Sequence, residues 1–234
     1  MIKHFLNVVF HPVEFMESHG FVQAAWFPLL IVTVGLILLR MTLVPEMRKE
    51  YSSPEYKKWY MERQSVTEEQ AGKDIEKMYQ IAPIMSFFES PVMVVVGAAG
   101  IALFLSLIGR FGYRQTLDEK GQRIGFIQVF HMTAWASAVS IFPIIVQAGM
   151  KYFELGTGLP TNVAFYLPKE AEGTYLYNIL QTMDLFLIWQ VLLLGLGMAA
   201  LYGVSKQRAI SSVGTLFVIL AIFNAMALTL TVAK

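Results

Sequence analysis

Five long apolar stretches constrain this chain more than any other feature of its sequence. They cover residues 24–44, 91–108, 126–149, 183–203 and 212–232. About 20 consecutive apolar residues are enough for a helix to cross the hydrocarbon core of a bilayer. In lipid every backbone polar group must be satisfied within the protein, and no segment alternates as a closed barrel would, so helices are expected. The sequence therefore predicts an all-α fold, a polytopic transmembrane helical bundle with about five spans.

The composition agrees with a chain that lies mostly in lipid. Hydrophobic residues make up 56% of the sequence and charged residues 15%, whereas soluble domains average about 45–50% and 25%. The net charge of +1 provides no basic field for nucleic acid. The chain has no cysteine, which excludes disulfides, thiolate metal sites and a cysteine nucleophile. Nucleic-acid binding is therefore excluded, and membrane lipids are the expected surroundings.

An arm of 23 residues precedes the first apolar stretch. Apolar residues recur along it at helical spacing, and they are Ile2, Phe5, Leu6 and Val9. Pro12 and Gly20 interrupt the pattern. This spacing fits an amphipathic helix that lies in the membrane interface. A short helix packed on the bundle is an equally good alternative.

The segment 45–83 is the long polar stretch of the chain. Two capping-box patterns divide it, Ser52-x-x-Glu55 with Pro54 in the first turn, and Thr67-x-x-Gln70. After the second, one helix face collects the apolar residues Ala71, Ile75, Met78, Tyr79 and Ala82. Trp59 is typical of an interfacial anchor. We predict two amphipathic helices resting on the membrane or the bundle; a mobile hairpin outside the membrane is the alternative.

These features divide the chain into four regions. They are an N-terminal interfacial arm (1–23), the first span (24–44), the amphipathic helical insertion (45–83) and the four-span remainder of the bundle (84–234). An odd number of spans places the two termini on opposite sides of the membrane.

Positive charge in short loops predicts which side is cytoplasmic. With five spans, the loops 109–125 and 204–211 lie on the same side as the N-terminus. Their basic residues are Arg110, Arg114, Lys120, Arg123, Lys206 and Arg208. The positive-inside rule then makes the N-terminus cytoplasmic. Seven basic residues in 45–83 argue the other way, but short loops weigh more in this rule.

Two passages resemble one protein family. The first is the run FLNVVFHPVEF (5–15), with Pro12 near its end, and the second is MDLFLIW (183–189) followed by LLLGLG (192–197). Together with a proline inside the third span, Pro143, they resemble bacterial proteins of the Yip family, named after the Ypt/Rab-interacting proteins. In this sequence the matching motif residues of the second passage are Asp184, Phe186, Trp189, Gly195 and Gly197. The insertion 45–83 is longer than the resemblance leads us to expect.

The resemblance implies a polytopic membrane protein that is not an enzyme and needs no cofactor. For a bacterial relative it implies the inner membrane and a role as a subunit or scaffold that binds other membrane proteins. Accessory partnership with ABC-type transporter subunits is one form of this role. The motif residues would then be structural.

Asp184 stands where the fourth span begins. A carboxylate there either caps the first turn of the helix and complements its dipole, or binds a cation or relays protons. We favour the cap. Trp189 lies about one and a half turns further along, so we interpret it as a packing residue rather than as part of a ligand platform.

Small residues repeat every four positions in the fourth span. Gly195, Ala199 and Gly203 therefore share one face, and such faces let helices approach closely in lipid. The partner helix belongs to the same chain or to a second copy in a homo-oligomer. In the third span, Pro143 removes the hydrogen bond to the carbonyl of Val139, which predicts a kink.

The alternative function is a small transporter or channel that uses Asp184, His131 and Glu89. Intramembrane ionisable residues are typical of such proteins. However, the sequence has no recognisable catalytic fingerprint. His4, His11 and His19 are spaced too widely for a tight metal chelate. We therefore predict no catalytic residues and no metal site.

Overall fold

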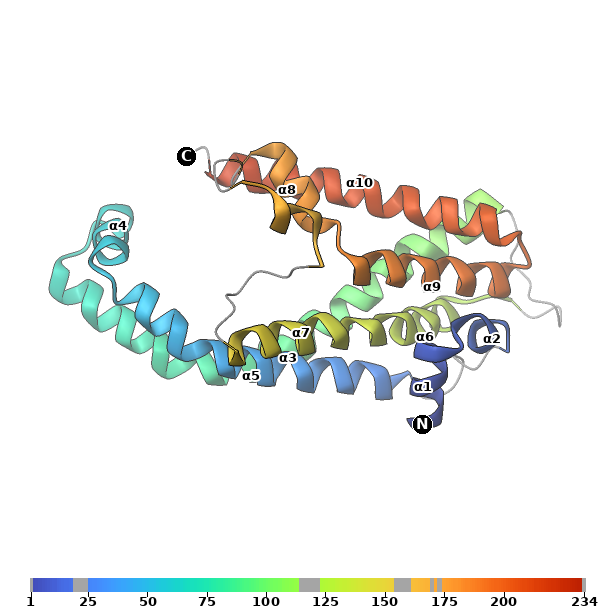
Figure 1. Ribbon diagram of the computed structural model, residues 1–234, viewed down its shortest axis with the longest axis horizontal. Helices are drawn as coiled ribbons and strands as arrows, with labels where there is room; N and C mark the ends of the chain where they lie inside the picture. The colour runs from blue at the N-terminus through green and yellow to red at the C-terminus, as the bar shows by residue number, and fades with distance from the viewer. Residues whose placement is uncertain are drawn as a thin grey trace.

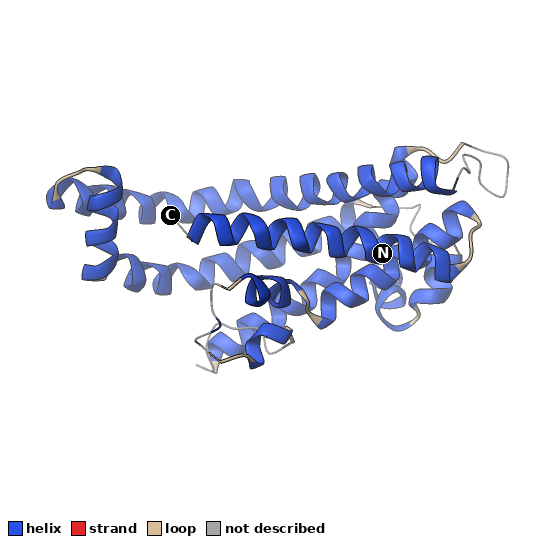
Figure 2. Ribbon diagram, turned by 90° about the horizontal axis from the view of Figure 1, so that it is seen from above, coloured by secondary structure: helices blue, strands red, loops and turns tan. Residues whose placement is uncertain are grey.

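The computed structural model describes residues 2–18, 25–113, 123–153, 161–168, 171 and 174–232. Within these ranges the chain is helical apart from short connections and isolated bridge positions, such as the pair Asn162 and Asp184 (Figures 1 and 2). The main helices are α1 (Ile2–Phe10), α2 (Pro12–Glu17), α3 (Trp26–Tyr51), α4 (Pro54–Gln64), α5 (Glu68–Leu107), α6 (Phe126–Ala136), α7 (Ile141–Tyr152), α8 (Tyr175–Thr182), α9 (Leu185–Tyr202) and α10 (Lys206–Val232). Single turns η2 (Ile108–Tyr113), η3 (Ser137–Ser140) and η4 (Val163–Tyr166) lie between them.

The predicted all-α polytopic bundle is confirmed. In the described part of the chain, four helical segments are long and apolar enough to cross a membrane. They are Phe87–Tyr113, Phe126–Met150, Leu185–Tyr202 and Lys206–Ala227. The remaining predicted span lies in α3, whose apolar part, Trp26–Thr42, is shorter.

The core of the bundle forms where α6 and α9 meet the N-terminal arm. Trp135 on α6 is fully buried, as are Leu193, Leu194 and Met198 on α9. Phe15 lies 5.3 Å from Trp135 between ring centroids. Aromatic side chains bury more surface area than other side chains and therefore contribute most to the packing of a core. The core is therefore centred on Trp135.

The arm packs its inner face on this core. Pro12 occupies the first turn of α2, where its missing N–H costs nothing. Phe15 and Met16 of α2 are buried, and so is Val8 of α1. Leu6 and Phe10 of α1 remain exposed. The arm is thus compatible with both predicted positions, the bundle surface and the membrane interface. One apolar face packs on the bundle, and a second apolar face remains exposed.

The segment 45–83 differs from its prediction. Instead of a second separate amphipathic helix, residues 68–82 are the first half of α5, which continues through Pro83 and Pro91 to Leu107. α3 runs alongside α5, and α4 closes the far end to form a hairpin that projects from the bundle (Figure 1). Prolines are tolerated inside such helices when a neighbouring helix supports the freed backbone groups. The prediction of a separate amphipathic helix is therefore wrong for residues 68–82, which are continuous with the second span. That the segment rests on the membrane or the bundle stays a prediction.

One of the two helix caps predicted in this hairpin lies at the predicted residue, and the other lies one residue later. Ser53, rather than Ser52, is the N-cap of α4, and its hydroxyl accepts from the Tyr56 N–H at 3.2 Å. Thr67 caps α5 as predicted, accepting from the Gln70 N–H at 3.4 Å. The Gln70 side chain donates to Asp74 instead of reaching back to the cap. The second capping box is thus only half formed.

The third span is interrupted near its centre. η3, a 3₁₀ turn, separates α6 from α7 and ends three residues before Pro143. Pro143 cannot donate to the carbonyl of Val139. The hydroxyls of Thr133 and Ser137 donate to the carbonyls four residues earlier, at 2.9 Å each, a pattern that bends helices. The break lies where the sequence predicted a kink.

Candidate functional site

Asp184 is the N-cap of α9. Its carboxylate accepts a hydrogen bond from the Leu187 N–H at 2.8 Å. The backbone on both sides of it is held by a short bridge: Val163 N–H donates to the Met183 carbonyl at 3.2 Å, and Leu185 N–H to the Thr161 carbonyl at 3.1 Å. A carboxylate at this position also complements the positive end of the helix dipole. In this structure the Asp184 carboxylate is placed as a helix cap, and its structural role stays a prediction.

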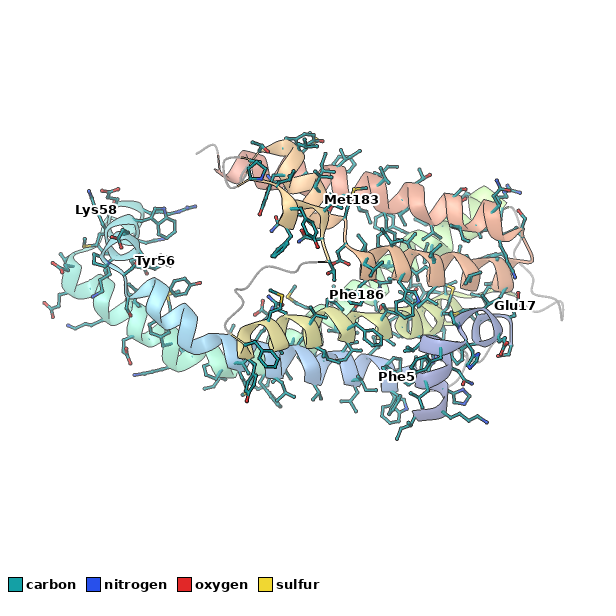
Figure 3. The ribbon with its side chains drawn as sticks, in the orientation of Figure 1. Phe5, Glu17, Tyr56, Lys58, Met183 and Phe186 are labelled. Atoms are coloured by element: carbon teal, nitrogen blue, oxygen red, sulfur yellow. The ribbon has the colours of Figure 1, made fainter. Side chains whose placement is uncertain are left out.

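Phe186 and Trp189 stack on one ring of α7. The Phe142 centroid lies 6.0 Å from that of Phe186 and 5.8 Å from that of Trp189, with interplanar angles of 8° and 10°. Residues three apart lie on the same face of a helix, which allows both rings to reach the same partner. Figure 3 shows Phe186 pointing toward α7 from the start of α9. Phe142 precedes Pro143, so these motif residues meet beside the interrupted helix.

Gly195 and Gly197 mark two close helix contacts. A Cβ on Gly195 would lie 2.6 Å from Ile210 Cγ1 and 2.8 Å from Ile210 Cα on α10. A Cβ on Gly197 would lie 2.5 Å from Met132 Sδ on α6. Real Cβ atoms do not approach other atoms so closely. A side chain at Gly195 would meet the Ile210 backbone and force α9 and α10 apart, whereas one at Gly197 would first displace the flexible Met132 side chain. The two glycines face different neighbours.

The third member of the predicted small-residue face has another role. Ala199 is buried, but Gly203 is exposed and adopts φ 59 as the C-cap of α9. That left-handed conformation is the usual reason for glycine at a helix end. Gly203 therefore ends the helix rather than lining a helix contact, because the helix stops before the four-residue repeat is completed.

The residues considered for transport are engaged separately. Glu89 accepts from the Arg40 guanidinium at 2.8 Å, and this exposed pair links α5 to α3. Asp184 caps α9. His131 on α6 lies beside Phe130, 6.4 Å between ring centroids. Among the described residues there is no group of three or more His, Asp or Glu side chains that could hold a metal ion.

The structure reveals an aromatic cluster at the far end of the hairpin, which we call the hairpin tip (residues 51–66). Tyr51 and Tyr56 stack with centroids 4.5 Å apart, and Tyr56 lies 5.3 Å from Trp59. The Arg63 guanidinium lies over the Trp59 ring at 5.2 Å. Figure 3 shows Tyr56 and Lys58 at this tip, far from the core at the opposite end of the molecule. Sequence reasoning treated Trp59 only as a membrane anchor, because nothing local shows that α3 and α5 carry it away from the bundle.

The opposite end of the bundle gathers basic residues near the arm. Lys206 pairs with Glu17 at 2.6 Å. Arg208 donates to the Gly112 carbonyl at 2.9 Å and lies 5.4 Å over the Tyr113 ring. The arm, the end of η2 and the α9–α10 turn therefore lie at one end of the bundle, as expected when an even number of spans separates each from the next.

A model of the Yip1 domain matches residues 6–228, which is nearly the whole chain. No curated protein and no solved structure matches the chain significantly. The match includes the arm with Pro12, the interrupted helix with Pro143 and the Asp184–Gly197 passage, whose contacts are given above.

Proposed function

We propose that this chain, which belongs to the Yip1 domain family, is a non-enzymatic integral membrane subunit that binds protein partners through its hairpin tip. One observation supports this most strongly: the hairpin projects beyond the bundle and exposes an aromatic and charged surface on α4. α4 has no buried residue. Because α4 contributes no residue to the core, its side chains are accessible to a partner molecule.

Helix length supports the position of the hairpin outside the hydrocarbon. α5 has 40 residues, so it extends about 60 Å, twice the hydrocarbon thickness of about 30 Å. Between Glu89 and Arg110 it carries no charged side chain. The 21 helical steps from Glu89 to Arg110 span about 32 Å, which fits one crossing of the membrane. The half of α5 that precedes Glu89 then lies beyond the membrane together with α4.

The chemistry of the tip suits a protein interface. Trp, Tyr and Arg are the residues most enriched at the centres of interfaces. Trp59 is 46% exposed, and its ring is already held by Tyr56 and Arg63. A side chain ordered before binding loses less entropy when the partner arrives.

We further propose a partner for the chain and the side of the membrane on which its hairpin tip lies. From the resemblance to bacterial relatives, we assign the chain to the inner membrane as an accessory of ABC-type transporter subunits; a second copy of the chain is the alternative partner. The basic short loops favour a cytoplasmic N-terminus. The hairpin tip would then lie on the opposite side.

Two single-cysteine variants test this orientation, since the native chain has no cysteine. Lys58→Cys places a thiol on α4 and Gln207→Cys places one at the start of α10; both positions are exposed. A membrane-impermeant thiol reagent applied to intact cells should label position 58 and leave 207 unmodified. The reverse pattern would overturn the assignment.

Partner binding is tested by a pair of tryptophan substitutions. Trp59→Ala removes the exposed ring of the tip, and Trp26→Ala removes a somewhat more exposed ring at the other end of α3. After purification in mild detergent, Trp59→Ala should lose co-purifying chains that the wild type and Trp26→Ala retain. Identical sets of chains in all three preparations would contradict a role for the tip.

The transporter alternative makes a different prediction about the ionisable residues. Asp184→Asn keeps a good capping side chain while removing the charge, and His131→Ala removes the imidazole. In a scaffold both variants should accumulate normally, keep their partners and retain the cellular phenotype. If either variant accumulates and keeps its partners but is inactive, the chain is a transporter rather than a scaffold.

A further inference from the structure

A cavity of about 350 Å³ opens at the basic end of the bundle. It lies where η2, the chain entering α6 and the end of α9 meet. Arg110 of η2 and Arg123, just before α6, both line it. Two cations that are 13 positions apart in the sequence therefore face one space. No acidic side chain is found among the described residues that line the cavity.

These two arginines differ from the other basic residues nearby. Lys206 is neutralised by Glu17, and Arg208 donates to the Gly112 carbonyl. Arg110 lies 5.8 Å over the Phe111 ring, but neither it nor Arg123 has a carboxylate partner among the described residues. Among the described residues, no carboxylate neutralises the positive charge of this pair.

The part of the cavity toward the middle of the membrane is apolar. Leu107 is 43% exposed and lies three residues before Arg110, and Leu103 is 52% exposed and lies seven residues before it. Seven residues of helix correspond to about 10 Å. Phe126, at the start of α6, is 40% exposed and adds a ring to this side. The cavity thus combines a cationic mouth with an apolar wall that runs toward the hydrocarbon.

The local backbone builds this shape. η2 is a π-helical turn, a conformation that frequently occurs at functional sites. Gly109 in this turn lies directly against the Tyr202 ring, where a Cβ would overlap the ring atoms. Tyr202 can therefore line the cavity beside the two arginines.

We propose that this cavity binds an anionic phospholipid, with Arg110 and Arg123 holding the headgroup phosphate and an acyl chain lying along Leu103, Leu107 and Phe126. Guanidinium groups form short, charge-assisted hydrogen bonds to phosphate oxygens and match their geometry with two parallel donors. Basic cavities between membrane helices are suited to anionic headgroups. The site is at the opposite end of the molecule from the hairpin tip, so it does not depend on the proposed partner.

The test compares lipid binding in the wild type and in Arg110→Gln/Arg123→Gln. The full chain is reconstituted in nanodiscs of phosphatidylcholine with increasing phosphatidylglycerol, and bound lipid is counted by native mass spectrometry. Since each arginine near the headgroups contributes about fivefold to anionic-lipid affinity, the double variant should bind phosphatidylglycerol about 25-fold more weakly. Lys77→Gln, at an exposed position on α5, is the control and should bind as the wild type does.

Inorganic phosphate distinguishes a lipid from a free anion. At millimolar concentration it should neither displace bound phosphatidylglycerol nor raise the melting temperature of the wild type. Displacement by phosphate alone would show that the ligand is a free anion and would overturn the lipid assignment. Equal lipid binding by the wild type and the double variant would overturn the site itself. Both arginines are exposed, so the double variant is expected to keep its fold, which circular dichroism verifies.

Discussion

Helices α9 and α4 come from the same all-helical chain but are used in opposite ways. α9 buries eight of its 18 residues, while none of the 11 residues of α4 is buried. α9 is packed between α10, α6 and α2, and its glycines allow backbone approach. α4 contacts α5 and α3, and its Tyr56 stacks on Tyr51 of α3. The contrast indicates that the bundle determines stability and that the hairpin tip is available for binding.

The largest effect is expected from Trp135→Ala in the bundle. Trp135 is fully buried against Phe15 and Phe27, and a Trp or Phe to Ala change in a core costs about 3–5 kcal/mol of the free energy of unfolding. Thermal unfolding in detergent should show a lower melting temperature, with reduced accumulation in cells. A melting temperature equal to that of the wild type would mean that the core is not centred on this ring.

A smaller loss is expected from Gly195→Leu. The new side chain would overlap the Ile210 backbone, and overpacking of this kind costs about 1–3 kcal/mol. Gly100→Leu on α5 is the matched control, since a Cβ there meets nothing within 4 Å. The thermal-stability difference between the two variants is the measurement. Equal melting temperatures would refute close packing between α9 and α10.

The N-cap of α9 is expected to contribute less to the free energy of unfolding than either of these contacts. Asp184→Ala removes the acceptor for the Leu187 N–H, which should cost about 0.5–2 kcal/mol. Asp184→Asn keeps an acceptor in place and should remain near the wild type in the same unfolding experiment. If the alanine variant were as stable as the asparagine variant, the bond to Leu187 would contribute nothing to stability.

The smallest stability effect belongs to the hairpin tip. Trp59→Ala replaces the same residue type as Trp135→Ala, but on an exposed surface, where substitutions change stability by within about 0.5 kcal/mol. Its melting temperature should match that of the wild type even though partner binding is lost. A loss as large as that of Trp135→Ala would show that the tip is part of the core.

Local rules predicted the bundle better than the hairpin. Apolar stretches of sufficient length identified the spans because the bilayer fixes how long a helix must be. Asp184 was recognised as a candidate cap because its function depends only on the three residues that follow it. By contrast, the predicted insertion ends at 83 and the predicted second span starts at 91, whereas α5 runs without interruption from Glu68 to Leu107. α3 packs alongside α5, and this contact between distant segments cannot be inferred from the residues around Pro83 and Pro91.

The same limit applies to the candidate sites. Phe186 and Trp189 stack on Phe142, and the Tyr202 ring packs against Gly109. Both contacts join helical segments that are far apart in the sequence. The shared cavity of Arg110 and Arg123 is visible in the sequence only as a basic loop. Gly203 matched the spacing of a packing face, but the end of α9 decides its role. Spacing predicts which residues share a face, not where the helix stops.

The most direct test of the central claim is site-specific photocrosslinking in the native membrane. A photoreactive amino acid is placed at Lys58 on the exposed hairpin tip and, in a separate variant, at Ile219 on the exposed face of α10. The account predicts a discrete protein adduct from position 58, which Trp59→Ala abolishes, and only lipid adducts from position 219. Protein adducts from position 219 with none from position 58 would contradict it.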